Sequence, residues 1–220
     1  MNNRDIWSKI VMKRRAFLTI GLLTPFAPSL LLAQEMPPGP VGTAAQRYAG
    51  IHGEQFDIPA VDTSLLPPEY QRQVVRHPTS EQPGTIIVDT QNRILYLVGE
   101  EGMAVRYGVG IGRDGFSWSG RALIKMKREW PTWTPPSEMI ARQPELEPYR
   151  NGMAPGLDNP LGARALYLFE GGRDTLYRIH GTADASSIGM AVSSGCVRLL
   201  NQDVIDLYTR VPINTPVVVV

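Results

Sequence analysis

The sequence predicts a mostly β domain, a sandwich or barrel, preceded by a leader and a proline-rich arm. Seven short runs of strand-forming residues lie between residues 85 and 220, and only one stretch there has a clear helical pattern. The chain also holds 21 glycines and 19 prolines, which divide these runs by turns. Many short strands with frequent turns and few helices are typical of β sandwiches and barrels.

The expected strands are residues 85–89, 93–98, 103–111, 121–127, 166–169, 176–180 and 217–220. Thr90-Gln91-Asn92 separates the first two, as in a hairpin. Residues 121–127 alternate apolar and basic side chains, which indicates a half-buried strand. Residues 201–208 predict a helix with Asn201 as its N-cap. A buried strand at 217–220 would tie the end of the chain into a sheet.

Two segments lack this regular pattern. Residues 35–83 hold eight prolines, so we interpret 34–83 as a proline-rich linker or arm with one short helical piece near 68–75. Residues 131–160 hold seven prolines and predict a long irregular insertion within the domain. Such an insertion is usually functional, often as a lid or substrate wall. The alternative is a surface loop held in place by its prolines.

Residues 1–33 have the composition of an export signal. They carry five basic side chains and one acid, and an apolar stretch from residue 16 ends at Ala33, after which we expect cleavage. Lys13-Arg14-Arg15 before this stretch resembles a twin-arginine signal. The alternative is an uncleaved membrane anchor, which Pro25 and Pro28 make a poor spanning helix. The sequence therefore predicts an exported, periplasmic protein.

The net charge of the expected mature chain excludes one class of partner. The full sequence has 22 basic and 21 acidic residues, and removal of the leader leaves 17 and 20, a net charge of −3. The excess positive charge therefore belongs to the leader. A nucleic-acid-binding domain needs a basic patch, which this composition does not indicate.

Cys196 is the only cysteine, and His180 precedes it by 16 residues. A single thiol in an exported protein has no intramolecular disulfide partner, so it is either buried and inert or reactive. The other two histidines, His52 and His77, lie in the arm. His180 is therefore the candidate base for a thiol nucleophile. The alternative is an inert cysteine and an ordinary histidine at the end of a strand.

Residues around this pair support acyl transfer through a thioester. Gly195 lets the chain turn sharply before the thiol, so the amides around Gly195 and Cys196 could converge on one oxyanion. The backbone carbonyl of Gly181 is a candidate to orient the imidazole of His180. In a strand-like segment Arg198 would share a face with Cys196 and could hold a substrate carboxylate, or it could form an ion pair within the fold.

This pattern resembles the YkuD-type L,D-transpeptidase family, whose signature is a histidine, a spacer and Ser-x-Gly-Cys followed by an apolar residue and Arg or Asn. Here it runs from His180-Gly181-Thr182 to Ser193-Ser194-Gly195-Cys196-Val197-Arg198. Two other segments, 130–137 and 159–166, resemble segments of periplasmic members. Many relatives carry a second histidine directly before Gly-Cys, where this chain has Ser194. A role for that second imidazole cannot apply here. The resemblance covers residues 84–220, the expected catalytic domain.

The resemblance implies a peptidoglycan tetrapeptide stem as substrate. Cys196 would attack the bond between the third residue, a diamino acid, and the D-alanine at position four. His180 would accept the thiol proton and later protonate the departing D-alanine, while the amides of Ser194, Gly195 and Cys196 hold the oxyanion. The residues expected to contact the substrate are Arg198, Ser193, Trp133 and Asn159.

The resemblance leaves the acyl acceptor open. An amine of a second stem would give a 3→3 cross-link, an amine of an outer-membrane protein would attach that protein to the wall, and water would make the protein an L,D-carboxypeptidase. The family implies no metal or organic cofactor, and carbapenem-type inhibitors are expected to acylate Cys196. Alternatives from other classes are a non-catalytic peptidoglycan-binding or structural protein and a secreted cysteine peptidase.

Overall fold

The computed structural model describes residues 42–112, 119–193 and 195–220. The predicted leader, including its twin-arginine pattern and its cleavage point, lies outside the described residues. Among the described residues, no helix has the length and apolar character needed to cross a membrane.

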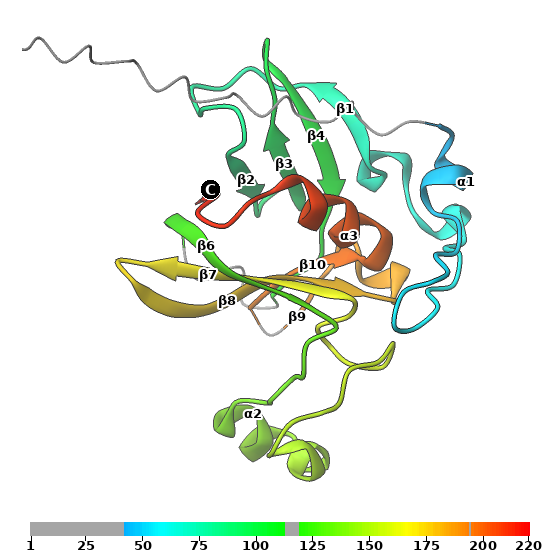
Figure 1. The fold of residues 1–220 in the computed structure, drawn as a ribbon, viewed down its shortest axis with the longest axis vertical. Helices are drawn as coiled ribbons and strands as arrows, with labels where there is room; N and C mark the ends of the chain where they lie inside the picture. Colours follow the sequence, from blue (N-terminus) through cyan, green and yellow to red (C-terminus); the bar gives the residue numbers. More distant parts are fainter. Residues whose placement is uncertain (1–41, 113–118, 194) are drawn as a thin grey trace, which may run out of the picture. The chain divides into compact units, whose positions relative to one another are not determined.

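Strands dominate the described residues, and the prediction of a mostly β fold with few helices is confirmed (Figure 1). The strands are β1 (Gln73–Arg76), β2 (Ile86–Asp89), β3 (Ile94–Val98), β4 (Met103–Gly108), β5 (Ile111–Gly112), β6 (Gly120–Glu129), β7 (Arg164–Glu170), β8 (Arg173–Thr182), β9 (Ala191–Ser193), β10 (Val197–Leu200) and β11 (Pro216–Val219). The α-helices are α1 (Ala44–Arg47), α2 (Ser137–Arg142) and α3 (Asn201–Arg210). Short 3-10 turns are η1 (Thr63–Leu65), η2 (Pro68–Tyr70), η3 (Pro144–Tyr149) and η4 (Ala185–Ser187).

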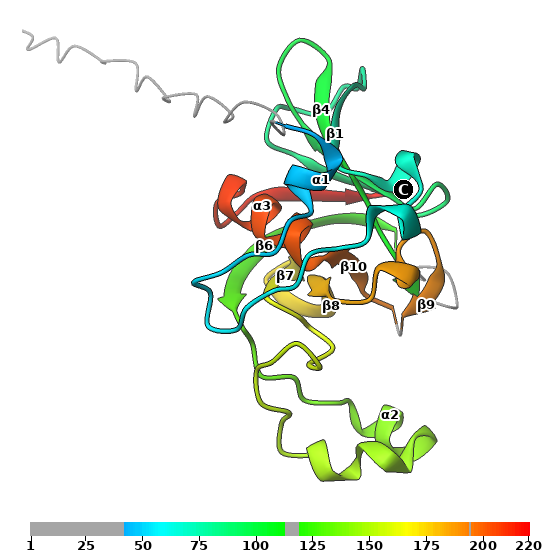
Figure 2. The ribbon, with the colours of Figure 1, turned by 90° about the vertical axis from the view of Figure 1, so that its right-hand side faces the viewer.

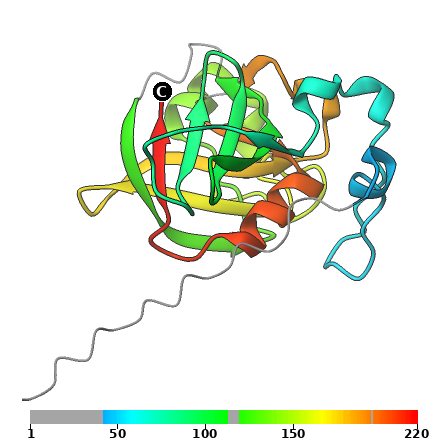
Figure 3. The same cartoon turned by 90° about the horizontal axis from the view of Figure 1, so that it is seen from above.

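Nine strands form one mixed sheet in the order β1-β4-β3-β2-β11-β6-β7-β8-β10, and β5 pairs with β9 separately. The C-terminal strand β11 joins the two halves of this sheet, since it runs parallel to β2 and antiparallel to β6. Gly110, just after β4, exchanges two backbone hydrogen bonds of 2.9 Å with Arg198 of β10. One end of the sheet, β10, therefore meets the segment that follows β4, next to the other end, and the sheet curves around its core (Figure 3).

The core is apolar and continuous across the sheet. Side chains from both halves, such as Leu95, Ile124, Ile179 and Val217, belong to one buried cluster. Three residues of α3 and the segment after it, Val204, Leu207 and Val211, pack against this cluster. One apolar face of the curved sheet is thereby covered by α3 (Figure 1).

One sequence interpretation is refined and another needs correction. The short helical piece expected near residues 68–75 is the turn η2, which is shorter than that range because β1 follows it and pairs antiparallel with β4. Asn201 was expected to cap a helix, but Leu200 occupies the cap position and Asn201 is the first helical residue. The side chain of Asn201 instead accepts a hydrogen bond from the Ala163 amide at 2.9 Å.

The described part of the arm, residues 42–83, is packed against the domain rather than extended as a free linker. Tyr48 and Leu66 are 1% exposed, and Ile58 is 2% exposed. Arg72, also buried, lies 3.2 Å from Asp206 and 3.6 Å from Asp203, both on α3. The arm therefore contributes its own buried residues to the fold. Its high proline content predicted a linker and gave no indication of this packing.

The segment 131–160 contains α2 and η3, and these helical turns stand away from the sheet (Figure 2). The segment is closed at its base by two backbone hydrogen bonds between Trp133 and Met153, of 3.1 and 2.7 Å. The segment is therefore a hairpin-like projection that contains the helical turns α2 and η3 and whose two ends are hydrogen-bonded to each other at its base.

Two adjacent leucines test the packing of the arm. Leu66 is buried in a cluster with Tyr48, Ile188 and Leu200, whereas Leu65 is 61% exposed. We expect Leu66→Ala to lower the free energy of unfolding by about 2–5 kcal/mol, because it leaves a cavity. Leu65→Ala should change it by no more than about 0.5 kcal/mol. Urea denaturation of both variants measures the difference, and equal effects would contradict a packed arm.

Candidate active site

The candidate site lies on the outer face of the parallel pair β8 and β10. In this pair His180 is opposite Arg198, and Ile179 is opposite Val197. Ile179 and Val197 point into the core. Successive side chains of a strand point to opposite faces, so His180 and Arg198 lie on the other face. Cys196, two residues before Arg198, directly precedes β10.

The imidazole of His180 is held in one tautomer. The side chain is 4% exposed, and Nδ1 lies 2.9 Å from the carbonyl oxygen of Gly181. A carbonyl oxygen only accepts hydrogen bonds, so Nδ1 carries the proton and Nε2 of the neutral ring has the lone pair. The sequence-based expectation that the Gly181 carbonyl contacts this ring matches the geometry.

Burial keeps this imidazole uncharged. It lowers the pKa of His180 to about 4, and the nearby positive charge of Arg198 acts in the same direction. The hydrogen bond to Gly181 opposes both effects but is weaker than burial. At neutral pH the ring is therefore a neutral base with Nε2 available.

Close packing against Gly162 and Asn201 fixes the position of the Gly181 carbonyl. A Cβ atom at Gly181 would lie 2.3 Å from Oδ1 of Asn201, so only glycine fits here. Gly162, with φ of +60°, packs against the same carbonyl group, and a Cβ there would be 2.7 Å from its oxygen. The side chain of Asn201 is itself held in place, because it accepts the hydrogen bond from the Ala163 amide. Sequence reasoning missed Asn201 and Gly162, because their role depends on contacts between distant segments.

The thiol of Cys196 is half-buried. Burial raises its pKa, while the backbone N–H of Arg178 and the positive charges of Arg178 and Arg198 act in the opposite direction. The resting state therefore combines a neutral thiol directly before β10 with a neutral imidazole on the neighbouring strand β8. Gly195 has φ of +112°, a conformation that favours glycine and turns the chain before the thiol.

A cleft of about 430 Å³ opens beside this face. Its lining residues are Leu157, Asp158, Asn159, Pro160, Thr182, Ala183, Asp184 and Arg198. Thr182 comes from the strand of His180, and Arg198 comes from the strand that directly follows Cys196. Nε of Arg198 is buried and has no hydrogen-bond partner among the described residues, while Asp158 and Asp184 are exposed. The lining of the cleft thus includes one cation and two carboxylates.

Asn159 lines the cleft, while its side-chain amide is held within the fold. Asn159 is 3% exposed, and its Nδ2 donates to the carbonyls of Pro131, Met153 and Ala154 at 3.0–3.2 Å. Its Oδ1 accepts from the Leu161 amide at 2.9 Å. These hydrogen bonds close the 131–160 segment, and contact between Asn159 and a substrate stays a prediction.

The remaining predicted residues are placed as follows. Trp133 is half-buried at the base of the 131–160 segment, paired with Met153. The backbone of Ser193 pairs with Gly112 at the end of β9, and Ser194 lies outside the described residues. Sequence reasoning missed Thr182, Asp158 and Asp184, although Thr182 and Asp184 lie in the same short run as His180.

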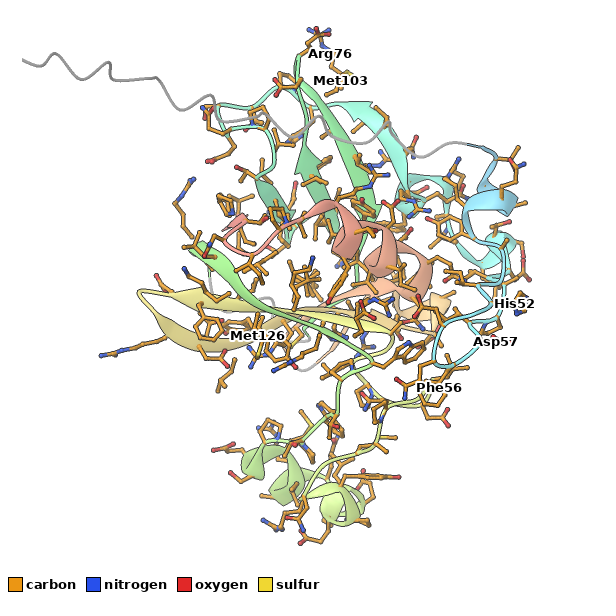
Figure 4. The ribbon with its side chains drawn as sticks, viewed as in Figure 1. His52, Phe56, Asp57, Arg76, Met103 and Met126 are labelled. Atoms are coloured by element: carbon orange, nitrogen blue, oxygen red, sulfur yellow. The ribbon has the colours of Figure 1, made fainter. Side chains whose placement is uncertain are left out.

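The other two histidines lie apart from this site in the arm. His52 is 80% exposed, with Nδ1 3.1 Å from Asp57, and both side chains lie at the outer edge of the arm (Figure 4). His77 stacks on Tyr96, with ring centroids 3.9 Å apart. Within the described part of the chain, no cluster of three or more His, Cys, Asp or Glu side chains is arranged to hold a metal ion.

Comparisons with known proteins agree on one family. A family model described as YkuD, L,D-transpeptidase catalytic domain, matches residues 83–219. The probable L,D-transpeptidase YbiS of Escherichia coli (strain K12) is 34% identical over 184 residues, 79% of this chain and 57% of that protein. A putative L,D-transpeptidase from the ATP synthase subunits region of Fuscovulum blasticum is 36% identical over 138 residues, 61% of this chain and 68% of that protein.

A solved structure from Brucella melitensis, described as a probable carnitine operon oxidoreductase, is also similar. It is 46% identical, covers 72% of this chain and 99% of that chain, and has a TM-score of 0.50. The chain spans less than two thirds of the length of YbiS. The matched range 83–219 contains both His180 and Cys196, together with the strands that position them. The chain therefore belongs to the YkuD family of L,D-transpeptidase catalytic domains.

Proposed function

We propose that this protein is an L,D-transpeptidase that transfers the acyl group of a peptidoglycan tetrapeptide stem through a thioester on Cys196. One observation carries the proposal: His180 is a buried neutral base with Nε2 unprotonated on β8, the strand that pairs with β10, and Cys196, the only cysteine of the sequence, directly precedes β10. A base of this kind serves both halves of an acyl transfer, since it can accept a proton and return it.

In the first half, the sulfur of Cys196 bonds to the carbonyl carbon of the third stem residue while the thiol proton passes to Nε2 of His180. The carbon–nitrogen bond to D-alanine then breaks, and the leaving amine takes that proton. In the second half, an amine attacks the thioester, its proton passes to His180, and the carbon–sulfur bond breaks to restore the thiol. The proton count balances in each half without a cofactor.

The oxyanion that forms on the carbonyl needs hydrogen-bond donors that are already in place. We assign this role to the backbone amides of Ser194, Gly195 and Cys196. The positive φ of Gly195 supports the assignment, because it turns the chain directly before the thiol. The charges of Arg178 and Arg198 add positive potential at the thiol, where negative charge develops.

The cleft supports a role in recognising the third stem residue. Arg198 lies two residues beyond Cys196, roughly 7 Å along an extended strand. Diaminopimelate, a diamino acid with two carboxylates, presents an ammonium and a carboxylate at the far end of its side chain, several bonds from the carbonyl under attack. Arg198 would bind the carboxylate, and Asp158 and Asp184 would bind the ammonium. The mixed charge of the cleft fits such a zwitterion better than a simple amine.

The proposed acceptors are those of the family. An amine of a second stem gives a 3→3 cross-link, an amine of an outer-membrane protein attaches it to the wall, and water releases a tripeptide stem. Each of these reactions requires the protein in the periplasm, which is the location that the leader-like residues 1–33 predict.

A carbapenem tests the nucleophile and the base together. We expect the intact protein to gain the mass of the inhibitor at Cys196 and Cys196→Ala to gain none. His180→Ala should slow acylation by about 10²-fold or more, because the thiol loses its base. His52→Ala is the matched control, since that exposed histidine lies in the arm. Absence of an adduct in the wild type would favour a non-catalytic wall-binding protein.

The pH dependence of acylation tests the state of His180. An ordinary histidine would lose base function as the pH falls through about 6.5. The lowered pKa predicts that Nε2 stays available until the pH falls through about 4. The acid limb of the rate, measured with circular dichroism as a check on folding, should therefore lie near pH 4. An acid limb near 6.5 would show that the imidazole is solvated.

Stem peptides that differ only at the third residue test the cleft. We expect kcat/KM to fall about 10- to 100-fold when the distal carboxylate of diaminopimelate is amidated, as loss of a charge-assisted hydrogen bond predicts. Arg198→Gln should remove this preference, and Asp184→Asn should weaken discrimination against an N-acetylated distal amine. Asp57→Asn, which changes an exposed carboxylate of the arm, is the control. Equal rates on all stems would overturn the assignment.

A further inference from the structure

The ring of Tyr70, at the end of η2 in the arm, rests directly on the loop that precedes β9. A Cβ atom added to Gly189 would lie 2.4 Å from Cε2 of Tyr70 and 2.7 Å from Cζ. Gly189 also has φ of +79°. A Cβ added to Gly108, at the end of β4, would lie 2.4 Å from the carbonyl oxygen of Tyr70. Two glycines therefore leave the space in which Tyr70 sits.

These glycines lie in two backbone segments that are hydrogen-bonded to each other and, through Gly110, to the strand beside the candidate site. The amide of Gly189 donates to the carbonyl of Val109 at 3.0 Å, and the amide of Ile111 donates to the carbonyl of Met190 at 3.0 Å. Gly110, between Val109 and Ile111, is paired with Arg198 on β10. Tyr70 thus lies against the loop, the loop is bonded to residues 109–111, and those residues are bonded to the strand that follows Cys196.

The arm also supplies most of the apolar surface that the loop buries. Tyr48, Leu66, Ile188 and Leu200 form a buried cluster, with Val61, Tyr70 and Ala185 packed against it. Ile188 and Ala185 come from the loop that follows Asp184, and Leu200 ends β10. Figure 3 shows the arm beside this loop. The loop is held both by these apolar contacts and by its backbone hydrogen bonds to residues 109–111.

We propose that Tyr70 is a positioning residue, whose ring holds the 184–190 loop and, through residues 109–111, sets Arg198 and the start of β10 against His180. Tyr70 lies outside the matched range 83–219, so the arm supplies a part of the active structure that the family domain alone does not contain. The kinetic consequence rests on the function proposed above. The structural consequence, an ordered loop, does not depend on it.

The test compares Tyr70→Ala, Tyr70→Phe and Leu97→Ala in the full chain. Leu97 is buried in β3, away from the loop, and serves as the matched destabilising control. Hydrogen exchange at the amides of Gly189 and Ile111 reports the loop, and stem kinetics report the site. We expect Tyr70→Ala to lose protection at both amides and to lower kcat by about 10- to 100-fold, as misplacement of reacting groups does. Tyr70→Phe should restore both properties, because the ring makes the contact.

The outcomes separate the two proposals. Loss of loop protection and of kcat in Tyr70→Ala, but not in Leu97→Ala, supports the positioning role. Unchanged protection and kcat in Tyr70→Ala, or equal losses in Leu97→Ala, overturns it while the transpeptidase proposal stands. A wild type that turns over no stem overturns the proposed function, whereas selective loss of loop protection in Tyr70→Ala still supports the role of Tyr70 in ordering the loop.

Discussion

The hydrogen bond from Nδ1 of His180 to the carbonyl of Gly181 is the interaction on which the candidate chemistry depends. It is local in sequence, yet it exists only because the carbonyl is fixed by contacts with Gly162 and Asn201. Burial of the ring would otherwise leave a polar N–H without a partner, which is costly. The same bond selects the tautomer that leaves Nε2 as a base, so one contact satisfies the fold and prepares the chemistry.

The electrostatics of the site favour neutrality before reaction. Burial lowers the pKa of His180 and raises that of Cys196, so neither group gains from being charged in the resting state. The charges of Arg178 and Arg198 lie close enough to Cys196 to oppose part of this effect. Negative charge therefore becomes favourable only as the sulfur attacks, which is the condition for stabilising the transition state more than the ground state.

The sequence predicts the regular strands well because their signal is local. Short runs of strand-forming residues identify β2, β3 and β11, and alternation of apolar and basic residues identifies β6, without knowledge of their partners. The short strands β9 and β10 were not predicted, since their pairing with distant segments fixes them. The candidate thiol and its candidate base follow from residue type and spacing. The cleft does not, because Asp158, Asp184 and Arg198 come from three separate segments, and the hydrogen bonds that hold the side chain of Asn159 depend on a fold-specific hairpin.

The arm contacts two elements next to the candidate site, the helix α3 and the loop before β9. We therefore interpret the arm as a functional part of the domain. On one side, Tyr48 donates a hydrogen bond of 3.2 Å to Asp203, and Arg72 approaches the same carboxylate. Asp203 lies two residues after Asn201, in the first turn of α3. The arm therefore anchors the helical turn that carries Asn201, the residue that packs against the Gly181 carbonyl beside His180.

On the other side, Tyr70 packs on the loop that leads to Cys196. Burial raises the pKa of Asp203 to about 7, although Arg72 opposes this rise, so the carboxylate is retained at a cost that apolar packing alone would avoid. A buried polar contact of this kind is directional. It fixes the position of the first turn of α3 relative to the arm more tightly than a hydrophobic contact would. The strand pair that carries His180 and follows Cys196 is therefore connected on both sides to one N-terminal segment.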